Sequence, residues 1–313
     1  MKKIIFVFVA LAVNTSLFGK PPIDTNIHRI VFLGNSITYA GNYIVDMEAW
    51  FITHYPKQNI EFINVGLPSE TVSGLSEEGH AGGAFPRPDL HERLQRVLAA
   101  TKPDLVFACY GMNDGIYLPF DKERFQKFKE GVTWMHDMVV KLGAKIIHVT
   151  PPVYDELKGG SIGYANTLDR YSDWIIQQKK INKWEVADLH YSMKAFLDAH
   201  RKVDSIYHLS GFAYADDGVH PNETGHWVMA KSILLYLGEK EVSLVPDIKT
   251  AMVKYKNGIQ ILKLVTERQE LMKDAWLTAT GHKRPGIKQG LPLEEAKAKA
   301  ASIGEQIKKQ LNT

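Results

Sequence analysis

The segment His28–Thr38 reads HRIVFLGNSIT and joins a short apolar run to a cluster of small polar residues. β-Branched and aromatic residues that stop at a glycine predict a buried strand over residues 29–33, followed by a tight turn. In open parallel sheets, ligand sites lie just beyond the carboxyl ends of the strands. Ser36 stands at such an end and is therefore a candidate reactive group. The alternative is that Gly34-Asn35-Ser36 only forms a turn that caps the next helix.

Short apolar runs alternate with longer amphipathic stretches along most of the chain. The predicted strands are residues 29–33, 60–65, 104–111, 145–150 and 184–189, and the predicted helices between them are residues 43–55, 88–100, 122–142 and 164–180. This alternation implies right-handed crossovers and a parallel sheet with helices on both faces. The expected fold class is therefore α/β, a three-layer α/β/α sandwich.

A further helix, in the segment PNETGHWVMAKSILLYLG after His220, is expected to close the main domain near Leu237. Residues 240–313 contain two charged helical tracts joined by the loop ATGHKRPGIKQGLP, and they show no strand pattern. We expect a main domain over residues 28–237 and a helical C-terminal extension over residues 240–313.

Composition and charge describe an ordinary globular protein. The chain has 313 residues, of which 45% are hydrophobic, and 38 basic against 35 acidic residues give a net charge of +3. No basic block of the kind that nucleic-acid binding needs is present, so we expect no nucleic-acid partner. No segment after the N-terminal one is long and apolar enough to predict a membrane span.

The N-terminal segment MKKIIFVFVALAVNTSLFGK combines a basic start with a short apolar run and small polar residues, which is typical of a secretory signal peptide. We expect residues 1–19 to be removed and the mature protein to be secreted or periplasmic. The single cysteine, Cys109, lies in a predicted strand, so no internal disulfide is expected.

Partners for Ser36 stand near the end of the main domain. A serine hydroxyl becomes a good nucleophile only when a neighbouring base takes its proton, and a third group usually holds that base. In the segment YADDGVHPNETGH, Asp217 precedes His220 by three residues, with Gly218 between them. Such a loop can fold so that the carboxylate accepts from one imidazole nitrogen; a surface turn rich in Asp and Gly is the alternative.

Two other strand ends offer hydrogen-bond donors for an oxyanion. YGMNDG follows the third predicted strand and contains Gly111 and Asn113, and GLPSET follows the second. Donors aimed at the developing negative charge are what ester or amide hydrolysis requires.

These four blocks, GNSIT, NVGLPSET, YGMND and DGVH, resemble those of the SGNH or GDSL hydrolase family in the same order. The resemblance covers about residues 28–237 and implies a flavodoxin-like α/β/α domain. It further implies that Ser36 is the nucleophile, His220 the general base and Asp217 the residue that orients it. The backbone amides of Ser36 and of the second-block turn, together with the Asn113 side chain, would form the oxyanion hole.

The sequence departs from the family pattern at two positions. Asn35 replaces the usual acid of the first block, and its amide can still hydrogen-bond to the loop while the charge is lost. In the second block, Ser69 stands where the family has a glycine, and a serine backbone amide can still donate. We favour Ser69 as the second oxyanion donor, with Gly66 as the alternative.

The substrate is inferred from the signal peptide and from EEGHAGGAFPRPDLHERL, which resembles a subgroup found with carbohydrate-degrading systems. We therefore expect a carbohydrate O-acetyl esterase that acts on an acylated small molecule or polysaccharide. His80 and Arg87 are candidates to contact a sugar or carboxylate, or else Arg87 only ties down a glycine-rich surface loop. The other candidates for substrate contact are Asn35, Glu70 and Asp114.

Other functions stay open at this stage. The same residues would serve a lipase or thioesterase acting on lipid acyl esters, and a non-catalytic glycan-binding protein could keep the fold. No compact metal-ligand spacing occurs among the 12 histidines, so we expect neither a metal nor another cofactor. The basic loop GHKRPGIKQGLP either returns to the mouth of the site, where it would bind an acidic sugar, or simply packs on the domain.

Overall fold

A five-stranded parallel sheet with the strand order β2-β1-β3-β4-β5 forms the centre of the molecule. The computed structural model describes residues 23–207 and 211–312, so the predicted signal peptide lies outside the described residues. The strands are β1 (Arg29–Gly34), β2 (Glu61–Asn64), β3 (Leu105–Cys109), β4 (Lys145–Val149) and β5 (Glu185–Ala187). The five predicted strands are confirmed, each within a few residues of its expected ends.

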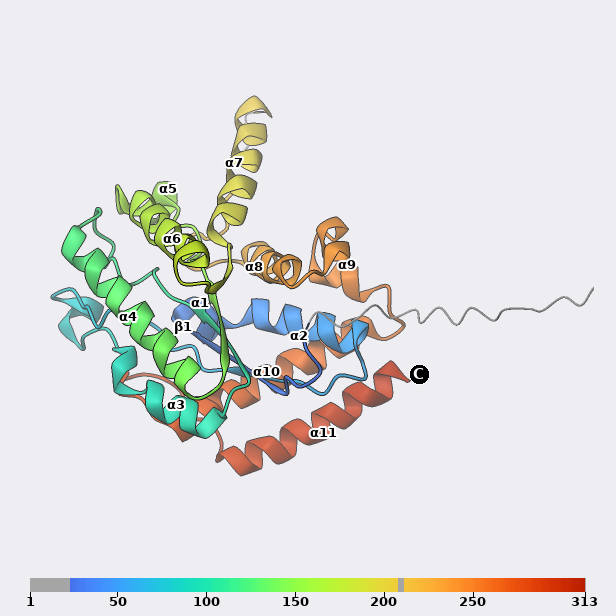
Figure 1. Cartoon of the computed structure of the whole chain (residues 1–313). Helices are drawn as coiled ribbons and strands as arrows, with labels where there is room; N and C mark the ends of the chain where they lie inside the picture. Colours follow the sequence, from blue (N-terminus) through green and yellow to red (C-terminus); the bar gives the residue numbers. More distant parts are fainter. Residues whose placement is uncertain (1–22, 208–210, 313) are drawn as a thin grey trace, which may run out of the picture.

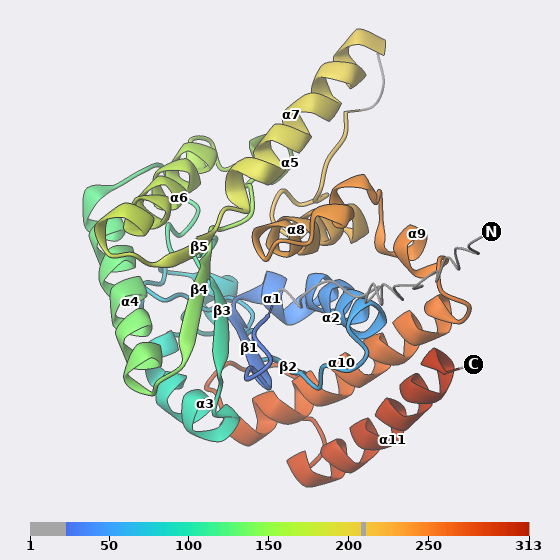
Figure 2. The ribbon, with the colours of Figure 1, turned by 45° about the vertical axis from the view of Figure 1, so that its right-hand side comes forward.

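Helices cover both faces of the sheet, as predicted, so that the fold has three layers (Figures 1 and 2). Residues of α2 and α8 pack with Ile30 and Phe32 of β1 on one face. Residues of α3, α4 and α6 pack with Val31 and Leu33 on the other. The helices are α1 (Ser36–Ala40), α2 (Asn42–His54), α3 (Leu94–Thr101), α4 (Lys122–Lys141), α5 (Glu156–Gly159), α6 (Tyr164–Ile181), α7 (His190–Tyr207), α8 (Glu223–Tyr236), α9 (Ile248–Met252), α10 (Gly258–Thr280) and α11 (Leu293–Leu311), with short 3₁₀ helices η1 (His80–Gly83), η2 (Leu90–Glu92) and η3 (Lys240–Leu244).

Strand β1 is continuously apolar because both of its faces are covered. It lies between β2 and β3, and the side chains from Ile30 to Leu33 are fully buried. Burial of each such side chain contributes roughly 1.5–3 kcal/mol. The turn after β1 therefore starts from one of the most firmly held strands of the sheet.

The C-terminal helices pack on the sheet domain. Helix α10 lies beside the edge strand β2, and α11 packs against α10 (Figure 2). The Gln269 side-chain amide donates to the backbone carbonyl of Phe62 on β2 (2.9 Å) and to the Glu48 carboxylate on α2 (2.7 Å). Arg268 donates to the same carboxylate (2.9 Å). The extension thus covers a sheet edge that would otherwise expose unpaired backbone groups.

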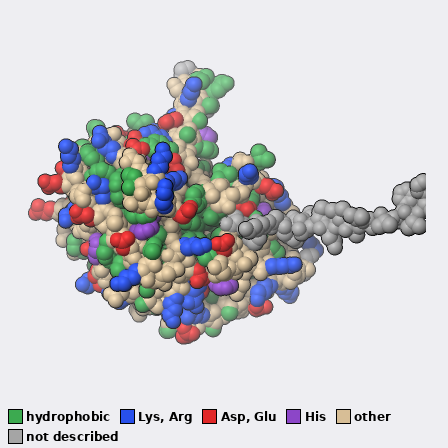
Figure 3. All heavy atoms as spheres, viewed as in Figure 1, with side chains coloured by type: hydrophobic (Ala, Val, Ile, Leu, Met, Phe, Trp, Pro, Cys, Tyr) green, Lys and Arg blue, Asp and Glu red, His purple; other side chains and the backbone are tan. Residues whose placement is uncertain are grey.

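Helix α7 projects from the body of the molecule (Figures 1 and 2) and was not predicted. Acidic and basic side chains are interspersed over the face shown in Figure 3. Within the part of the chain that the structure describes, no helix is both long and apolar enough to cross a membrane.

Candidate active site

Ser36 is the first residue of α1 and follows the carboxyl end of β1. Asn35 caps α1, since its Oδ1 accepts the Ile37 backbone amide (3.1 Å). A Cβ atom on Gly34 would lie 2.2 Å from the Thr38 Oγ1 and 2.9 Å from the Cys109 carbonyl oxygen. The turn therefore needs glycine for space and a short polar side chain for the cap. The Asn35 side chain is buried, and its oxygen is engaged in this cap. The prediction that Asn35 contacts the substrate is therefore wrong.

His220 connects Ser36 to Asp217. The Ser36 Oγ lies 2.9 Å from the His220 Nε2, and the His220 Nδ1 lies 2.6 Å from the Asp217 Oδ2. The other carboxylate oxygen accepts the backbone amides of Val219 (2.9 Å) and His220 (2.8 Å). Gly218 has φ +77°, and a Cβ atom there would lie 2.5 Å from the Gly159 amide nitrogen. The loop thus folds around the carboxylate and aims the imidazole at the serine.

The charge of Asp217 favours one tautomer of the His220 imidazole. Partial burial raises the pKa of the Asp217 carboxyl, but the hydrogen bonds from His220 and Val219 outweigh it and the pKa is lowered overall. An ionised Asp217 accepts a hydrogen bond from the Nδ1–H of His220, which leaves the lone pair of the His220 Nε2 facing the serine hydroxyl. The arrangement is therefore able to take a proton from Ser36 as the hydroxyl attacks.

The two candidate backbone donors of the second-block turn have different hydrogen-bond partners. The Gly66 amide donates to the Asn64 Oδ1 (2.9 Å), so it is already used. A Cβ atom on Gly66 would lie 2.4 Å from the Tyr39 backbone nitrogen, so this glycine allows the turn to pack against α1. Ser69 has φ +68°, the left-handed region that favours glycine. Among the described residues, no hydrogen bond uses the Ser69 amide.

Asn113 is buried next to the second-block turn and held from both ends. Its Nδ2 donates to the Glu70 carbonyl oxygen (3.1 Å), and its Oδ1 accepts the Tyr117 hydroxyl (3.0 Å). An amide nitrogen carries two hydrogens, so one N–H is left over after the contact with Glu70. These contacts fix the orientation of the Asn113 side chain.

Two of the expected substrate contacts are buried carboxylates with structural partners. Glu70 forms a bidentate ion pair with Arg93 (2.6 and 2.7 Å) and accepts the Tyr110 hydroxyl (2.6 Å), and all of these groups lie in the interior. Asp114 accepts three backbone amides, from Val72, Ser73 and Gly111 (2.8–2.9 Å). Neither side chain is exposed, so the prediction that Glu70 and Asp114 contact the substrate is wrong. Their role is to hold the second and third blocks together.

Arg87 and His80 belong to the loop after the second block. Arg87 donates twice to the Glu77 carboxylate (both 2.6 Å) and lies over the Tyr117 ring, 5.3 Å from its centroid. The His80 Nδ1 lies 3.3 Å from the same carboxylate. These contacts favour the alternative in which Arg87 ties down the loop over the one in which it contacts the substrate. Through Tyr117, the loop also supports Asn113.

Tyr117 is a residue near the site that was not expected from the sequence. It lies in the segment after the third block with a left-handed backbone conformation (φ +55°). A tyrosine four residues after Asn113 is the only sequence signal that points to it.

Within the described residues, no group of three or more His, Cys, Asp or Glu side chains is arranged to hold a metal ion.

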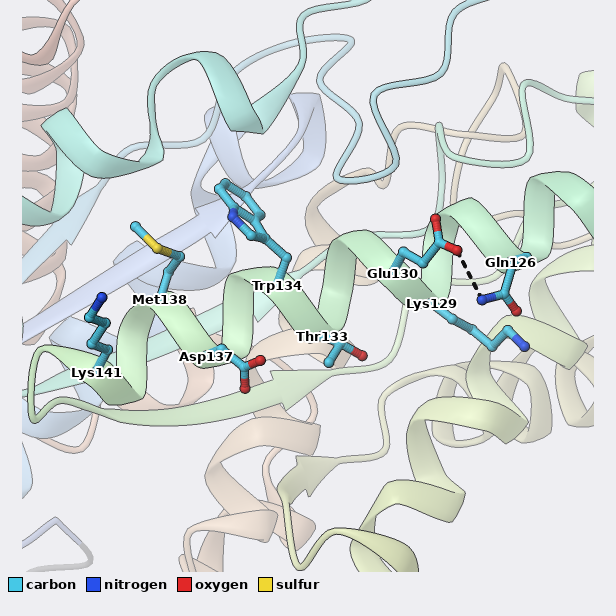
Figure 4. A pocket seen from close by; sticks show the side chains of 8 residues that line it. All are labelled: Gln126, Lys129, Glu130, Thr133, Trp134, Asp137, Met138 and Lys141. Carbon is cyan, nitrogen blue, oxygen red and sulfur yellow. Dashed lines mark hydrogen bonds between the residues drawn. The ribbon is translucent and has the colours of Figure 1, made fainter.

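A surface hollow of about 710 Å³ lies along α4 (Figure 4). All of its lining side chains come from this one helix, between Gln126 and Lys141. None of them belongs to the four blocks, and the Gln126 amide donates to the Glu130 carboxylate one turn along the same helix. The hollow is therefore separate from the Ser36 site.

A three-layer α/β/α protein with a serine, a histidine and an aspartate hydrogen-bonded at the carboxyl ends of its strands has the design of a serine hydrolase. The model of the GDSL-like lipase/acylhydrolase family matches residues 32–228. The chain belongs to this family and is a serine ester hydrolase, which confirms the resemblance seen in the four blocks.

Three comparisons describe what the chain is similar to. An acetylxylan esterase of Geobacillus stearothermophilus is 25% identical over 232 residues, which cover 67% of this chain and 94% of that protein. The crystal structure of Axe2, an acetylxylan esterase of that organism, is 22% identical with a TM-score of 0.50, over 67% of this chain and 94% of that one. BT4096, a gut microbial diltiazem-metabolizing enzyme, is 24% identical with a TM-score of 0.51, over 67% of this chain. This chain covers 47% of BT4096, about half its length. The two structures show the shared fold.

Proposed function

We propose that this protein is a secreted esterase that removes O-acetyl groups from a carbohydrate, with Ser36 as nucleophile, His220 as general base and Asp217 as its orienting carboxylate. The observation that carries the proposal is the hydrogen-bonded chain from Asp217 through His220 to Ser36. The similarity to an acetylxylan esterase supports an acetylated carbohydrate as substrate.

The reaction has two halves. In the first, the His220 Nε2 takes the proton of the Ser36 hydroxyl while the Oγ attacks the acetyl carbonyl carbon. The tetrahedral intermediate collapses with cleavage of the bond to the sugar oxygen, which receives the proton from His220. In the second half, a water molecule loses a proton to His220 and attacks the acetyl-serine. Acetate leaves, and Ser36 regains its proton.

The oxyanion formed in each half needs hydrogen-bond donors. We assign this role to the backbone amides of Ser36 and Ser69 and to the free N–H of the Asn113 side chain. The hydrogen bond between Asn113 and Glu70 fixes the side chain before substrate arrives, and preorganised donors need no rearrangement when the charge develops.

An open site supports a bulky substrate. The His220 and Asp217 side chains are 53% and 55% exposed, so an ester on a large, polar molecule can approach the serine without entering a deep cavity. Secretion is supported by the pattern of residues 1–20, and N-terminal sequencing of the mature protein tests it, with a start after residue 19 as the expected result.

Acetate release from a panel of acetylated glycans, measured for the wild type and for Ser36→Ala, tests the proposal. We expect Ser36→Ala to lose hydrolysis while its circular dichroism spectrum matches the wild type, because the hydroxyl contributes little to packing. Ser192→Ala, which removes an exposed serine hydroxyl on α7, is the matched control and should keep full activity. Wild-type rates in Ser36→Ala would rule out the mechanism.

Acyl chain length separates carbohydrate deacetylation from lipid hydrolysis. A series of p-nitrophenyl esters from acetate to palmitate should show fast turnover of acetate and slow turnover of long chains. The opposite order would favour a lipase or thioesterase, and no turnover of any ester with intact glycan binding would favour a non-catalytic protein.

A further inference from the structure

The loop between α10 and α11, residues 281–292, lies against the second-block turn. The Arg284 Nε donates to the Pro68 carbonyl oxygen (2.9 Å), 216 residues away in the sequence. The guanidinium also lies over the Phe85 ring, 5.3 Å from its centroid, and its Nη1 donates to the Pro285 carbonyl oxygen (2.7 Å). Arg284 is thus fixed on two sides while it contacts the turn.

The Pro68 carbonyl and the Ser69 amide belong to the same peptide group. Because this group is planar, a hydrogen bond that holds the carbonyl also fixes the direction of the N–H on its opposite side. A charged donor on the carbonyl further polarises the peptide and strengthens the hydrogen bond that the N–H donates.

We infer that Arg284 is a positioning residue for ester hydrolysis: it orients and polarises the peptide whose N–H, at Ser69, binds the oxyanion. The inference rests on the proposed function, in which Ser69 supplies that donor. It places a residue of the C-terminal extension, outside the region matched by the family model, in support of the reaction centre.

The backbone conformation of Ser69 explains why such support is needed. A non-glycine residue at φ +68° is strained, and it keeps this conformation only where its surroundings enforce it. The charge-assisted hydrogen bond from Arg284 is one such constraint. The hydrogen bond from the Glu70 amide to the Leu67 carbonyl oxygen (3.2 Å), which closes the turn around Ser69, is another.

The loop that carries Arg284 is anchored at both ends. At its start, the Arg96 side chain donates to the carbonyl oxygens of Thr280 (3.0 Å) and Gly281 (3.3 Å). At its end, the Gly290 amide donates to the Thr278 Oγ1 (2.8 Å), and a Cβ atom on Gly290 would lie 2.2 Å from the backbone of α10. Arg284 is therefore presented from a fixed support, as a positioning residue requires.

Helix α10 also contacts the element that carries the nucleophile. The Lys273 Nζ lies 4.0 Å from the centroid of the Tyr39 ring on α1. The extension thus touches both α1 and the second-block turn, the two elements that supply the proposed backbone donors.

The test compares Arg284→Met, which keeps chain length but has no donor, with Arg284→Lys, which keeps charge and donor. With p-nitrophenyl acetate, we expect Arg284→Met to lower kcat roughly 10-fold to 10²-fold with little change in KM, because the peptide shifts where the transition state needs it. Arg284→Lys should recover part of kcat. Lys283→Met removes the neighbouring charge, on a side chain that is 82% exposed, and should match the wild type.

Melting curves accompany the kinetics, and kcat is measured well below the melting temperature of each variant. If Arg284→Met does not fold, Arg284→Leu replaces it, and a wild-type kcat in the folded variant overturns the inference. A rise in KM confined to acidic substrates, with kcat unchanged, also overturns it, since Arg284 would then bind substrate. Both results leave the proposed function intact if Ser36→Ala is inactive, whereas an active Ser36→Ala would remove the proposed function itself.

Discussion

The Nε2 atom of His220 lies 2.9 Å from the Oγ atom of Ser36, although 184 residues separate them in the sequence. The contact joins the end of the inner strand β1 to the loop before α8. Because β1 is buried on both faces and α8 packs against the same sheet, the distance between base and nucleophile is set by the core.

Loss of the base should be nearly as damaging as loss of the nucleophile. We expect His220→Ala to reduce kcat by several orders of magnitude, with little further loss in the double variant with Ser36→Ala, because members of one catalytic unit are not additive. Steady-state kinetics on p-nitrophenyl acetate measures both. Additive losses would show that the two residues act separately.

Substitution of the orienting carboxylate tests the tautomer. Asp217→Asn should lose roughly 10⁴-fold in kcat, since an amide can stabilise the imidazole with its proton on the wrong nitrogen. The Val219 and His220 backbone amides still have an acceptor in the asparagine oxygen, so the melting temperature should change little. An active Asp217→Asn would remove the carboxylate from the mechanism.

The activity of the wild type should rise along a single limb as the pH increases, because only a neutral imidazole can take the serine proton. The lowered pKa of Asp217 keeps that carboxylate ionised throughout the limb, so it adds no second step there. A profile of kcat/KM with no rising limb would count against a histidine as the base.

Asn113 tests the oxyanion hole. Asn113→Ala should lower kcat by about 10²-fold to 10³-fold and leave KM almost unchanged, because the donor acts mainly in the transition state. Asn113→Asp should be worse, since it places a negative charge beside the forming oxyanion and opposite the Glu70 carbonyl oxygen. A folded Asn113→Asp with near wild-type kcat would remove Asn113 from the site.

Ser69 and Gly66 should respond in opposite ways. Ser69→Gly removes the strain of a left-handed serine backbone, which stabilises the folded state by about 1–2 kcal/mol. The greater freedom of glycine stabilises the unfolded state by about 0.4–1 kcal/mol. Chemical denaturation of Ser69→Gly should therefore show a small gain in the free energy of unfolding. Its kcat should stay within about twofold, because the donor is a backbone amide. Gly66→Ala should destabilise the fold, since its Cβ would lie 2.4 Å from the Tyr39 backbone nitrogen. A tenfold loss of kcat in Ser69→Gly would mean that the serine side chain itself takes part.

Asp46 makes stability depend on pH. Burial, together with the nearby carboxylates of Glu223 and Asp247, raises the pKa of Asp46 to about 8. The folded state therefore binds a proton that the unfolded state releases, so this contribution is present below about pH 4 and is lost as the pH rises toward 8. Asp46→Asn should gain roughly 2–4 kcal/mol relative to wild type between pH 4 and pH 9. The melting temperatures of the wild type and of Asp46→Asn at pH 4 and at pH 9 measure this gain. If the difference between the two proteins is the same at both pH values, Asp46 is not protonated in the folded state.

Much of the fold could be predicted because the strands are covered on both faces, which leaves continuous apolar runs such as RIVFL. Helix α7 was missed although apolar residues such as Met193, Phe196 and Val203 recur along its sequence at helical spacing. It projects from the body of the molecule, and only His190, Met193 and Leu197 are buried in it.

The three residues of the proposed triad could also be predicted, since each stands in a block beyond a strand or before a helix. The buried roles of Glu70 and Asp114 could not. Whether a carboxylate faces solvent or the core depends on partners such as Arg93, which lies 23 residues away from Glu70 in the sequence. The contact between Arg284 and Pro68 likewise exists only in the folded chain.

The distribution of the site along the chain also limits when activity can be acquired during synthesis. The nucleophile is synthesised early, on the first strand of the sheet, whereas the base comes after the last strand and Arg284 comes later still. A nascent chain that has formed β1, β2 and β3 contains a serine without its base. During synthesis, ester hydrolysis should therefore become possible only after the segment that carries His220 has emerged and docked on the sheet.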